Sequence, residues 1–132
     1  MEQEKIEQAQ KILEQFKIWA TDNKVEFLES EKRVYSEAWW TAGTCDFTCI
    51  IGGQRLVGDL KTMKTMWDRT PFFQTAAYMK MLVEQGEEKY DGTIIVNINK
   101  ETNKLTEYKS FDFEADIKSF EAALTLYRTI KI

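Results

Sequence analysis

Hydrophobic and polar positions alternate along this chain with two different periods, and the changes of period predict eight elements. Apolar residues recur at helical spacing in three segments. The helices are expected over residues 3–22, 71–85 and 113–130. Segments rich in β-branched and aromatic residues predict five strands. The strands are expected over residues 33–40, 42–51, 54–62, 92–99 and 105–110. The only proline, Pro71, lies where the middle helix begins, and there its missing N–H costs no hydrogen bond.

The order of these elements predicts the fold class. It reads α-β-β-β-α-β-β-α, which is typical of an α/β fold with a central mixed β-sheet, built around a β-hairpin and flanked by α-helices. The 132 residues contain no repeat, linker or low-complexity tract, so we expect a single domain over residues 1–132. Hydrophobic residues make up 43% of the chain, which is enough to form a core.

The hairpin predicts where two acidic side chains lie. Gly52 and Gly53 separate two apolar-rich runs, and a two-residue turn of the primed types needs positive φ. Counting outward from a turn centred there, Asp46 faces Asp59. Facing carboxylates lie about 5 Å apart at Cβ and destabilise the sheet. A divalent cation held between them would relieve this repulsion.

The same register sorts the hairpin side chains into two faces, because strand residues alternate between the two sides of a sheet. One face is expected to be polar and to look into a cleft: Thr44, Asp46, Thr48, Val57, Asp59 and Lys61. The other is expected to be apolar and to pack on helices: Cys45, Phe47, Cys49, Ile51, Leu56 and Leu60. Two acids and a lysine on one rigid face indicate metal-assisted phosphate chemistry.

Composition excludes several other chemistries. The chain contains no histidine, so it has no Ser-His-Asp triad, Cys-His dyad or HExxH zinc site. Its net charge of −4 gives no overall basic field, so contact with nucleic acid needs a local patch. No apolar run approaches the roughly 20 residues of a membrane span. The Glu- and Lys-rich N-terminus does not read as a signal peptide, and we expect a cytoplasmic protein.

The two cysteines, Cys45 and Cys49, are predicted to be free. Four residues apart on one strand, they are separated by about 13 Å. Disulfide Cα atoms must lie within about 7 Å of each other. We therefore expect two buried thiols, in keeping with a reducing cytoplasm.

Three motifs in sequence order resemble one family. The run from Gly43 to Asp46 is similar to a G-x-x-D strand, the run from Asp59 to Lys61 to a D/E-x-K strand, and the run from Gln74 to Tyr78 to a Q-x-x-x-Y helix. These motifs belong to the PD-(D/E)XK nuclease superfamily, in its RecB-like and phage-exonuclease branch. The resemblance covers residues 29–99 and implies a restriction-endonuclease-like fold.

The resemblance implies a metal-dependent deoxyribonuclease, an exonuclease of phage or bacterial DNA recombination or repair, in a bacterial cell or a phage-infected host. Asp46 and Asp59 would ligate Mg²⁺ or Mn²⁺, helped by the backbone carbonyl of Leu60. A water activated near the metal would attack the phosphodiester, and Lys61 would orient it or stabilise the developing charge. Glu31 matches a further acidic position of the family.

Five other residues have expected roles with open alternatives. Gln74 and Tyr78, four residues apart on one helix face, would hold the lysine, the metal shell or the substrate phosphate, or else pack the helix. Lys64, Trp67 and Arg69 form either a DNA-contacting loop, with the indole stacking on a base, or a mobile loop anchored by one aromatic side chain.

The chain departs from the family at its N-terminus. Members of this branch usually carry an acid, often a histidine, on an N-terminal helix as another metal ligand. Here Glu7 or Glu14 would have to substitute. The first helix resembles the family's second, so we expect the family's first helix to be missing. A second hypothesis is therefore a catalytically incomplete nuclease-fold module that binds DNA or a recombination partner protein without turnover. A third is an unrelated α/β domain whose acids bind a structural cation.

Overall fold

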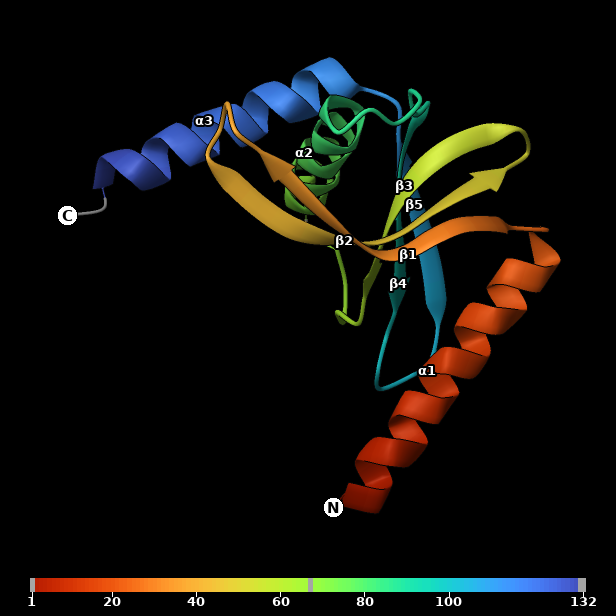
Figure 1. Cartoon of the computed structure of the whole chain (residues 1–132). Coiled ribbons are helices and arrows are strands. Elements are labelled where there is room, and N and C mark those ends of the chain that lie inside the picture. Colours follow the sequence, from red (N-terminus) through yellow and green to blue (C-terminus); the bar gives the residue numbers. More distant parts are fainter. Residues whose placement is uncertain (1, 67, 131–132) are drawn as a thin grey trace.

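Three helices and one five-stranded sheet make up the fold (Figure 1). This computed structural model describes residues 2–66 and 68–130. The elements are α1 (Glu2–Asp22), β1 (Glu26–Ser36), β2 (Thr41–Ile51), β3 (Gln54–Lys61), α2 (Thr70–Glu84), β4 (Gly92–Ile98), β5 (Leu105–Ser110) and α3 (Phe113–Ile130). The predicted element order and the predicted α/β class with a central mixed sheet are confirmed.

The sheet has the simple strand order β1-β2-β3-β4-β5. Only β3 and β4 run parallel, and α2 makes the crossover between them. The other neighbouring strands are antiparallel. All residues of β4 are buried, which explains its continuous β-branched run, because a strand covered on both faces has no solvent side.

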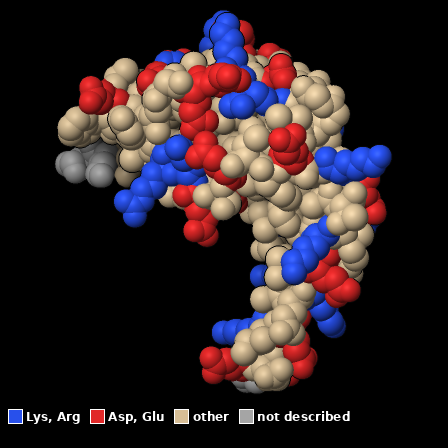
Figure 2. Space-filling model, turned by 45° about the vertical axis from the view of Figure 1, so that its right-hand side comes forward, with Lys and Arg blue, Asp and Glu red and all other residues tan. Residues whose placement is uncertain are grey.

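Helices cover both faces of the sheet. In Figure 1, α2 and α3 lie together on one side and α1 lies on the other. Figure 2 shows α1 extending from the body as an arm that carries charges of both signs. Trp19 is the one buried side chain of α1, so the helix is held mainly near its C-terminal end. None of the described helices is long and apolar enough to cross a membrane.

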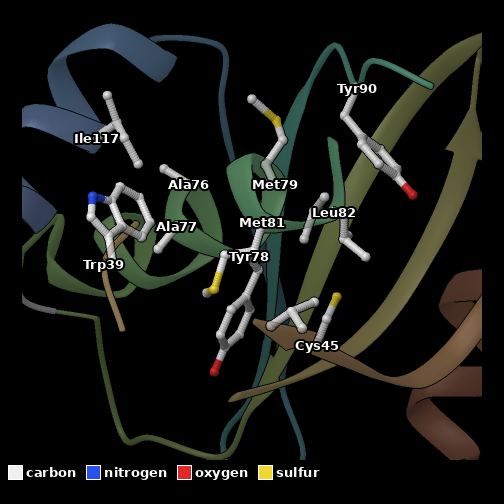
Figure 3. Close-up of a cluster of buried hydrophobic side chains, with 12 residues drawn as sticks. Trp39, Cys45, Ala76, Ala77, Tyr78, Met79, Met81, Leu82, Tyr90 and Ile117 are labelled. Carbon is white, nitrogen blue, oxygen red and sulfur yellow. The ribbon is translucent and has the colours of Figure 1, made fainter. Parts of the chain in front are cut away.

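The core divides into two clusters of buried side chains. The first lies between the sheet and the pair α2 and α3, and includes Cys45, Ala77 and Ile117 (Figure 3). The second lies on the α1 side and includes Trp19, Phe47 and Leu56. The second cluster continues into a group of tilted and edge-on aromatic rings around Phe16 and Phe27, at centroid distances of 5.4–6.4 Å.

The hairpin has the register that the sequence predicts. Gly52 and Gly53 form the turn with φ of 56° and 81°, which glycine adopts without strain. Strand pairing runs from Ile51 opposite Gln54 to Phe47 opposite Gly58. The backbone pairing of the two strands ends there, one pair before Asp46 and Asp59.

The expected start of the first strand is wrong. β1 begins at Glu26 rather than at residue 33 and ends at Ser36, while residues 37–40 form a turn. β1 is an edge strand whose side chains are mostly exposed and often charged, so it lacks the apolar alternation of a half-buried strand. Glu31 consequently lies inside β1, with φ of 50°, and not before it.

The expected sorting of the hairpin faces is wrong in two places. Cys45 packs in the cluster under α2, whereas Phe47, two residues later, packs on the α1 side. The alternation of β2 is therefore broken around Asp46. Val57 and its cross-strand partner Thr48 are fully buried rather than facing a cleft, because α2 covers that part of the sheet. Elsewhere on this face, Thr44 is exposed, and Asp46 and Lys61 each line an open cavity.

Candidate active site

Asp46 lies where the ladder between β2 and β3 ends. Its Oδ2 atom accepts a hydrogen bond from the backbone N–H of Leu60 at 2.9 Å. The carboxylate thus connects the two strands one step beyond their last backbone pair. Asp46 is half-buried and lines a cavity of about 730 Å³ between α1 and β1.

Asp59 and Lys61 form an ion pair beside Asp46. The Lys61 Nζ atom lies 2.9 Å from Asp59 Oδ2, and Asp59 is only 5% exposed. Burial, together with a hydrogen bond to the Asp46 carboxyl, raises the pKa of Asp59 to about 6, although the contact with Lys61 acts in the opposite direction. The two carboxyl groups therefore interact, as the hairpin register predicts. Lys61 offsets only part of the free energy that burial and the neighbouring carboxyl group cost the ionised form of Asp59.

The oxygen atoms at this point suit a hard divalent cation. Two carboxylates converge beside the backbone of Leu60, and oxygen is the ligand type that Mg²⁺ and Mn²⁺ prefer. Apart from Lys61, the buried Oδ2 atom of Asp59 has no partner. Within residues 2–66 and 68–130, no group of three or more His, Cys, Asp or Glu side chains is placed to hold a metal. A site with two carboxylates still fits Mg²⁺, which commonly keeps several waters and binds substrate phosphates.

Tyr78 reaches this site from α2. Its side chain is mostly buried, and Figure 3 shows it pointing from the helix toward the sheet, near Cys45. Burial raises the pKa of Tyr78 to about 12, and the charge of Asp59 contributes to the rise. A Cβ atom at Gly43 would lie 3.0 Å from the Tyr78 ring. Glycine at the first position of the G-x-x-D run therefore lets the Tyr78 ring lie against β2. The Tyr78 hydroxyl stays protonated and is available as a hydrogen-bond donor.

Gln74 lies one helical turn before Tyr78 and is exposed. Together with Lys61 it lines a cavity of about 740 Å³ that is bounded by the loop between β3 and α2. The structure therefore brings Gln74 to the same opening as Lys61, whereas Tyr78 belongs to the buried cluster under α2. Tyr78 thus packs under α2 and also lies close enough to Asp59 to feel its charge.

The three glutamates considered as further metal ligands, one on β1 and two on α1, differ in their distance from the cavity at Asp46. Glu31 is exposed and lines the same cavity as Asp46. Glu7 and Glu14 are exposed on α1 and are not among the side chains that line that cavity. Of these three, Glu31 is the one that shares a cavity with Asp46.

The cationic residues proposed for DNA contact already have anionic partners. Lys64 lies 3.2 Å from a Glu101 carboxylate oxygen, and both side chains are largely exposed. The Arg69 guanidinium donates to Asp116 Oδ1 at 2.8 Å and to Ser110 at 2.9 Å. Arg69 therefore anchors the end of the loop to α3 and β5. Trp67 lies outside the described residues.

Asn97, which is not among the residues predicted from the sequence, lies next to Lys61 in the parallel pairing of β3 and β4. Its side-chain amide accepts from the Met63 N–H and donates to the Met63 carbonyl, both at 2.9 Å. The asparagine thereby directs the chain out of the sheet just after Lys61. A polar residue within the β-branched run of β4 was the available signal.

Comparisons with known proteins add little to this geometry. No protein-family model matches the chain, and no curated protein matches it. Among solved structures, the crystal structure of SSO0001 is similar over 87% of this chain, with a TM-score of 0.47 and 15% sequence identity. The chain spans 57% of the length of that structure. A likeness of this degree carries no argument about function.

Proposed function

We propose that the protein is a metal-dependent deoxyribonuclease that hydrolyses DNA phosphodiester bonds, of the exonuclease type that serves phage or bacterial recombination and repair. The observation that carries this proposal is the convergence of Asp46, Asp59 and Lys61 where β2 and β3 separate. Two interacting carboxylates, one of them buried with a raised pKa, are costly to the fold. A cation site accounts for that cost, and perturbed pKa values are common at functional sites.

Each residue has a distinct role in this proposal. Asp46 and Asp59 would hold Mg²⁺ or Mn²⁺. The bound ion would supply charge neutralisation at the phosphate and an activated water. Lys61 would exchange its contact with Asp59 for one with the phosphate or the attacking water.

The helix residues act from the other side of the opening. The neutral Tyr78 hydroxyl would donate a hydrogen bond at the site, and its raised pKa keeps that proton in place at neutral pH. Gln74, exposed beside Lys61, would contact the DNA backbone. The PD-(D/E)XK resemblance of the same residues supports these assignments.

One observation favours a second candidate function. The donor set contains two carboxylates, and Glu7 and Glu14 do not line the cavity at Asp46. A nuclease-fold module that is catalytically incomplete, and that binds DNA or a recombination partner protein without turnover, would have this arrangement. It would bind DNA more tightly with Mn²⁺ than with EDTA, yet leave the DNA intact.

The test is degradation of linear double- and single-stranded DNA in Mg²⁺, Mn²⁺ or EDTA. We expect cleavage that requires metal and falls at least about 100-fold in Lys61→Ala, because a positioned charge at the transition state is worth at least that much. Lys89→Ala is the matched control, since Lys89 is exposed and lies in another loop. Thermal melting checks that both variants are folded.

The outcomes separate the hypotheses. Cleavage by Lys61→Ala at the parental rate would show that the site is assigned wrongly. Metal-dependent binding by the parent without any cleavage would favour the incomplete module. Stabilisation by Mg²⁺ without DNA affinity would leave only a structural cation site.

A further inference from the structure

A third cavity, lined mainly by polar side chains, adjoins the candidate site. It has a volume of about 290 Å³ and is bounded by the loop after β3, the end of β4 and the start of β5. We call it the β4–β5 groove. Its lining includes Lys64, Asn97, Asn99, Lys104, Thr106 and Tyr108. Thr65 lines both this groove and the cavity at Lys61 and Gln74, so the two openings are neighbours.

Sheet register connects the groove to Lys61. Asn97 pairs with Lys61 on β3 and with Thr106 on β5. Residues paired in register project to the same face of a sheet. A row of polar side chains therefore crosses three strands, beginning at the proposed catalytic lysine.

The loop that forms one wall of the groove is fixed in place. The Asn97 amide makes two hydrogen bonds with the backbone of Met63. The Asn99 amide donates to the Lys64 carbonyl at 3.1 Å. Because the amides of Asn97 in β4 and of Asn99 just after it hold the chain at residues 63 and 64, this wall of the groove does not have to form on binding.

The charge of the groove suits an anion. Among its lining residues there are two lysines and no carboxylate. Within the described part of the chain, Lys104 makes no ion pair, and the pair of Lys64 with Glu101 is solvent-exposed and therefore weak. The cavity at Asp46 is different, since its lining contains Glu29 and Glu31 and no Lys or Arg. Of these two cavities, only the β4–β5 groove is lined by lysines.

We propose that the β4–β5 groove binds one strand of DNA, which runs from Lys61 over Thr65 to Lys104. Lys64 and Lys104 contact successive phosphates, and a base stacks on the Tyr108 ring. Lysines that follow a backbone beside an aromatic ring are the usual means of binding a single strand. This inference rests on the proposed nuclease function and names its substrate as a single-stranded segment.

The first test measures binding of a fluorescent oligothymidylate of about 15 nucleotides to the full chain in Ca²⁺, over a series of salt concentrations. In the double variant Lys64→Ala/Lys104→Ala we expect affinity to fall about tenfold or more. The slope of log affinity against log salt should become shallower by about 1.4, because each single-strand phosphate contact contributes about 0.7. The double variant Lys89→Ala/Lys118→Ala changes net charge equally at exposed sites elsewhere and should match the parent.

Two further variants test the stacking and the ion pair. Tyr108→Leu should weaken binding about tenfold without changing the salt slope, because stacking is not a charge contact. Tyr35→Leu, at an exposed tyrosine on β1, should have no effect. Glu101→Gln should tighten binding, since it releases Lys64.

Cleavage separates the groove from the active site. In Mg²⁺, the groove double variant should lose activity on the long oligonucleotide mainly through KM, and cleave one of about three nucleotides as the parent does. If the parent cleaves DNA but the groove and control double variants have the same salt slope, the groove is assigned wrongly while the nuclease stands. A duplex that binds as tightly as the single strand would overturn the assignment to one strand. A parent that neither binds nor cleaves DNA overturns both proposals.

Discussion

Asp59 shows how the fold changes the chemistry of one residue. Burial and the Asp46 carboxyl raise its pKa from the ordinary 3.8 to about 6, although Lys61 lies 2.9 Å away. A carboxyl group with a raised pKa binds its proton more tightly in the folded than in the unfolded chain. Without metal, its charge therefore destabilises the protein above about pH 6. This penalty is relieved as the pH falls from about 6 toward 3.8.

Asp59→Asn should for this reason stabilise the metal-free protein, and more so at alkaline pH. In EDTA at about pH 8 we expect the free energy of unfolding to rise by about 1–2 kcal/mol, since one pKa unit corresponds to about 1.4 kcal/mol. Near pH 4 the gain should be small. Urea denaturation at the two pH values measures it, with Asp22→Asn on exposed α1 as the control. Equal destabilisation at both pH values would mean that Lys61 already compensates the carboxylate.

The residues of the site differ in how far the sequence could predict them. Asp46, Asp59 and Lys61 were predictable because a Gly-Gly turn fixes the hairpin register within a short stretch of chain. The break in alternation at Asp46 was not, because it depends on where β2 and β3 separate. Asn97 was missed because its role requires the loop after β3 to lie across a distant strand.

At the scale of elements, polar contacts hold the connection between β3 and α2 at both ends. Asn97 fixes its start, and Arg69 fixes its end by donating to Asp116 and Ser110. Ser110 in turn donates to Asp116 Oδ2 at 2.6 Å. Asp116 is only 2% exposed, so a single buried carboxylate joins the loop, the end of β5 and the first turns of α3.

Removing this carboxylate should loosen α3. Asp116→Ala leaves Arg69 without its buried partner and Ser110 without an acceptor. We expect the free energy of unfolding to fall by about 2 kcal/mol, because hydrogen bonds to a charged group are lost and the buried Ser110 hydroxyl loses its acceptor. Glu114→Ala, in the same helix but exposed, should change it by less than about 0.5 kcal/mol. Urea denaturation compares the two, and similar small effects would show that apolar packing alone docks α3.

The elements were predictable where burial leaves a period in the sequence. The three helices, β3, β4 and β5 lie within about two residues of expectation, since each has a buried face or stripe. The first half of β1 was not predicted, because Glu26, Glu29 and Lys32 belong to an edge strand that shows no apolar alternation. Its membership in the sheet comes from pairing with β2, which is a tertiary effect.

At the scale of the whole molecule, the hydrophobic clusters on the two faces of the sheet differ in how firmly helices cover them. The pair α2 and α3 covers one cluster, and α1, which buries only Trp19, covers the other. Cys45 and Cys49 report on them separately, because Cys45 lies under α2 and Cys49 lies on the α1 side. Both thiols are free and fully buried, and burial raises the pKa of each to about 12. Neither reacts without an opening of the structure, since the thiolate is the reactive form.

Openings should be more frequent on the α1 side. Ile6, Leu13 and Ile18 of α1 are each about half exposed, and elements with few buried apolar contacts open at lower free energy. In single-cysteine variants, we expect Cys49 (in Cys45→Ala) to react with dithiobis(nitrobenzoate) about tenfold faster than Cys45 (in Cys49→Ala). This difference corresponds to about 1.4 kcal/mol less opening free energy. The Cys49 rate should also depend less on urea, because undocking of α1 exposes less surface than unfolding of the whole chain. Equal rates with equal urea dependence would instead mean that both faces of the sheet open together, as one cooperative unit.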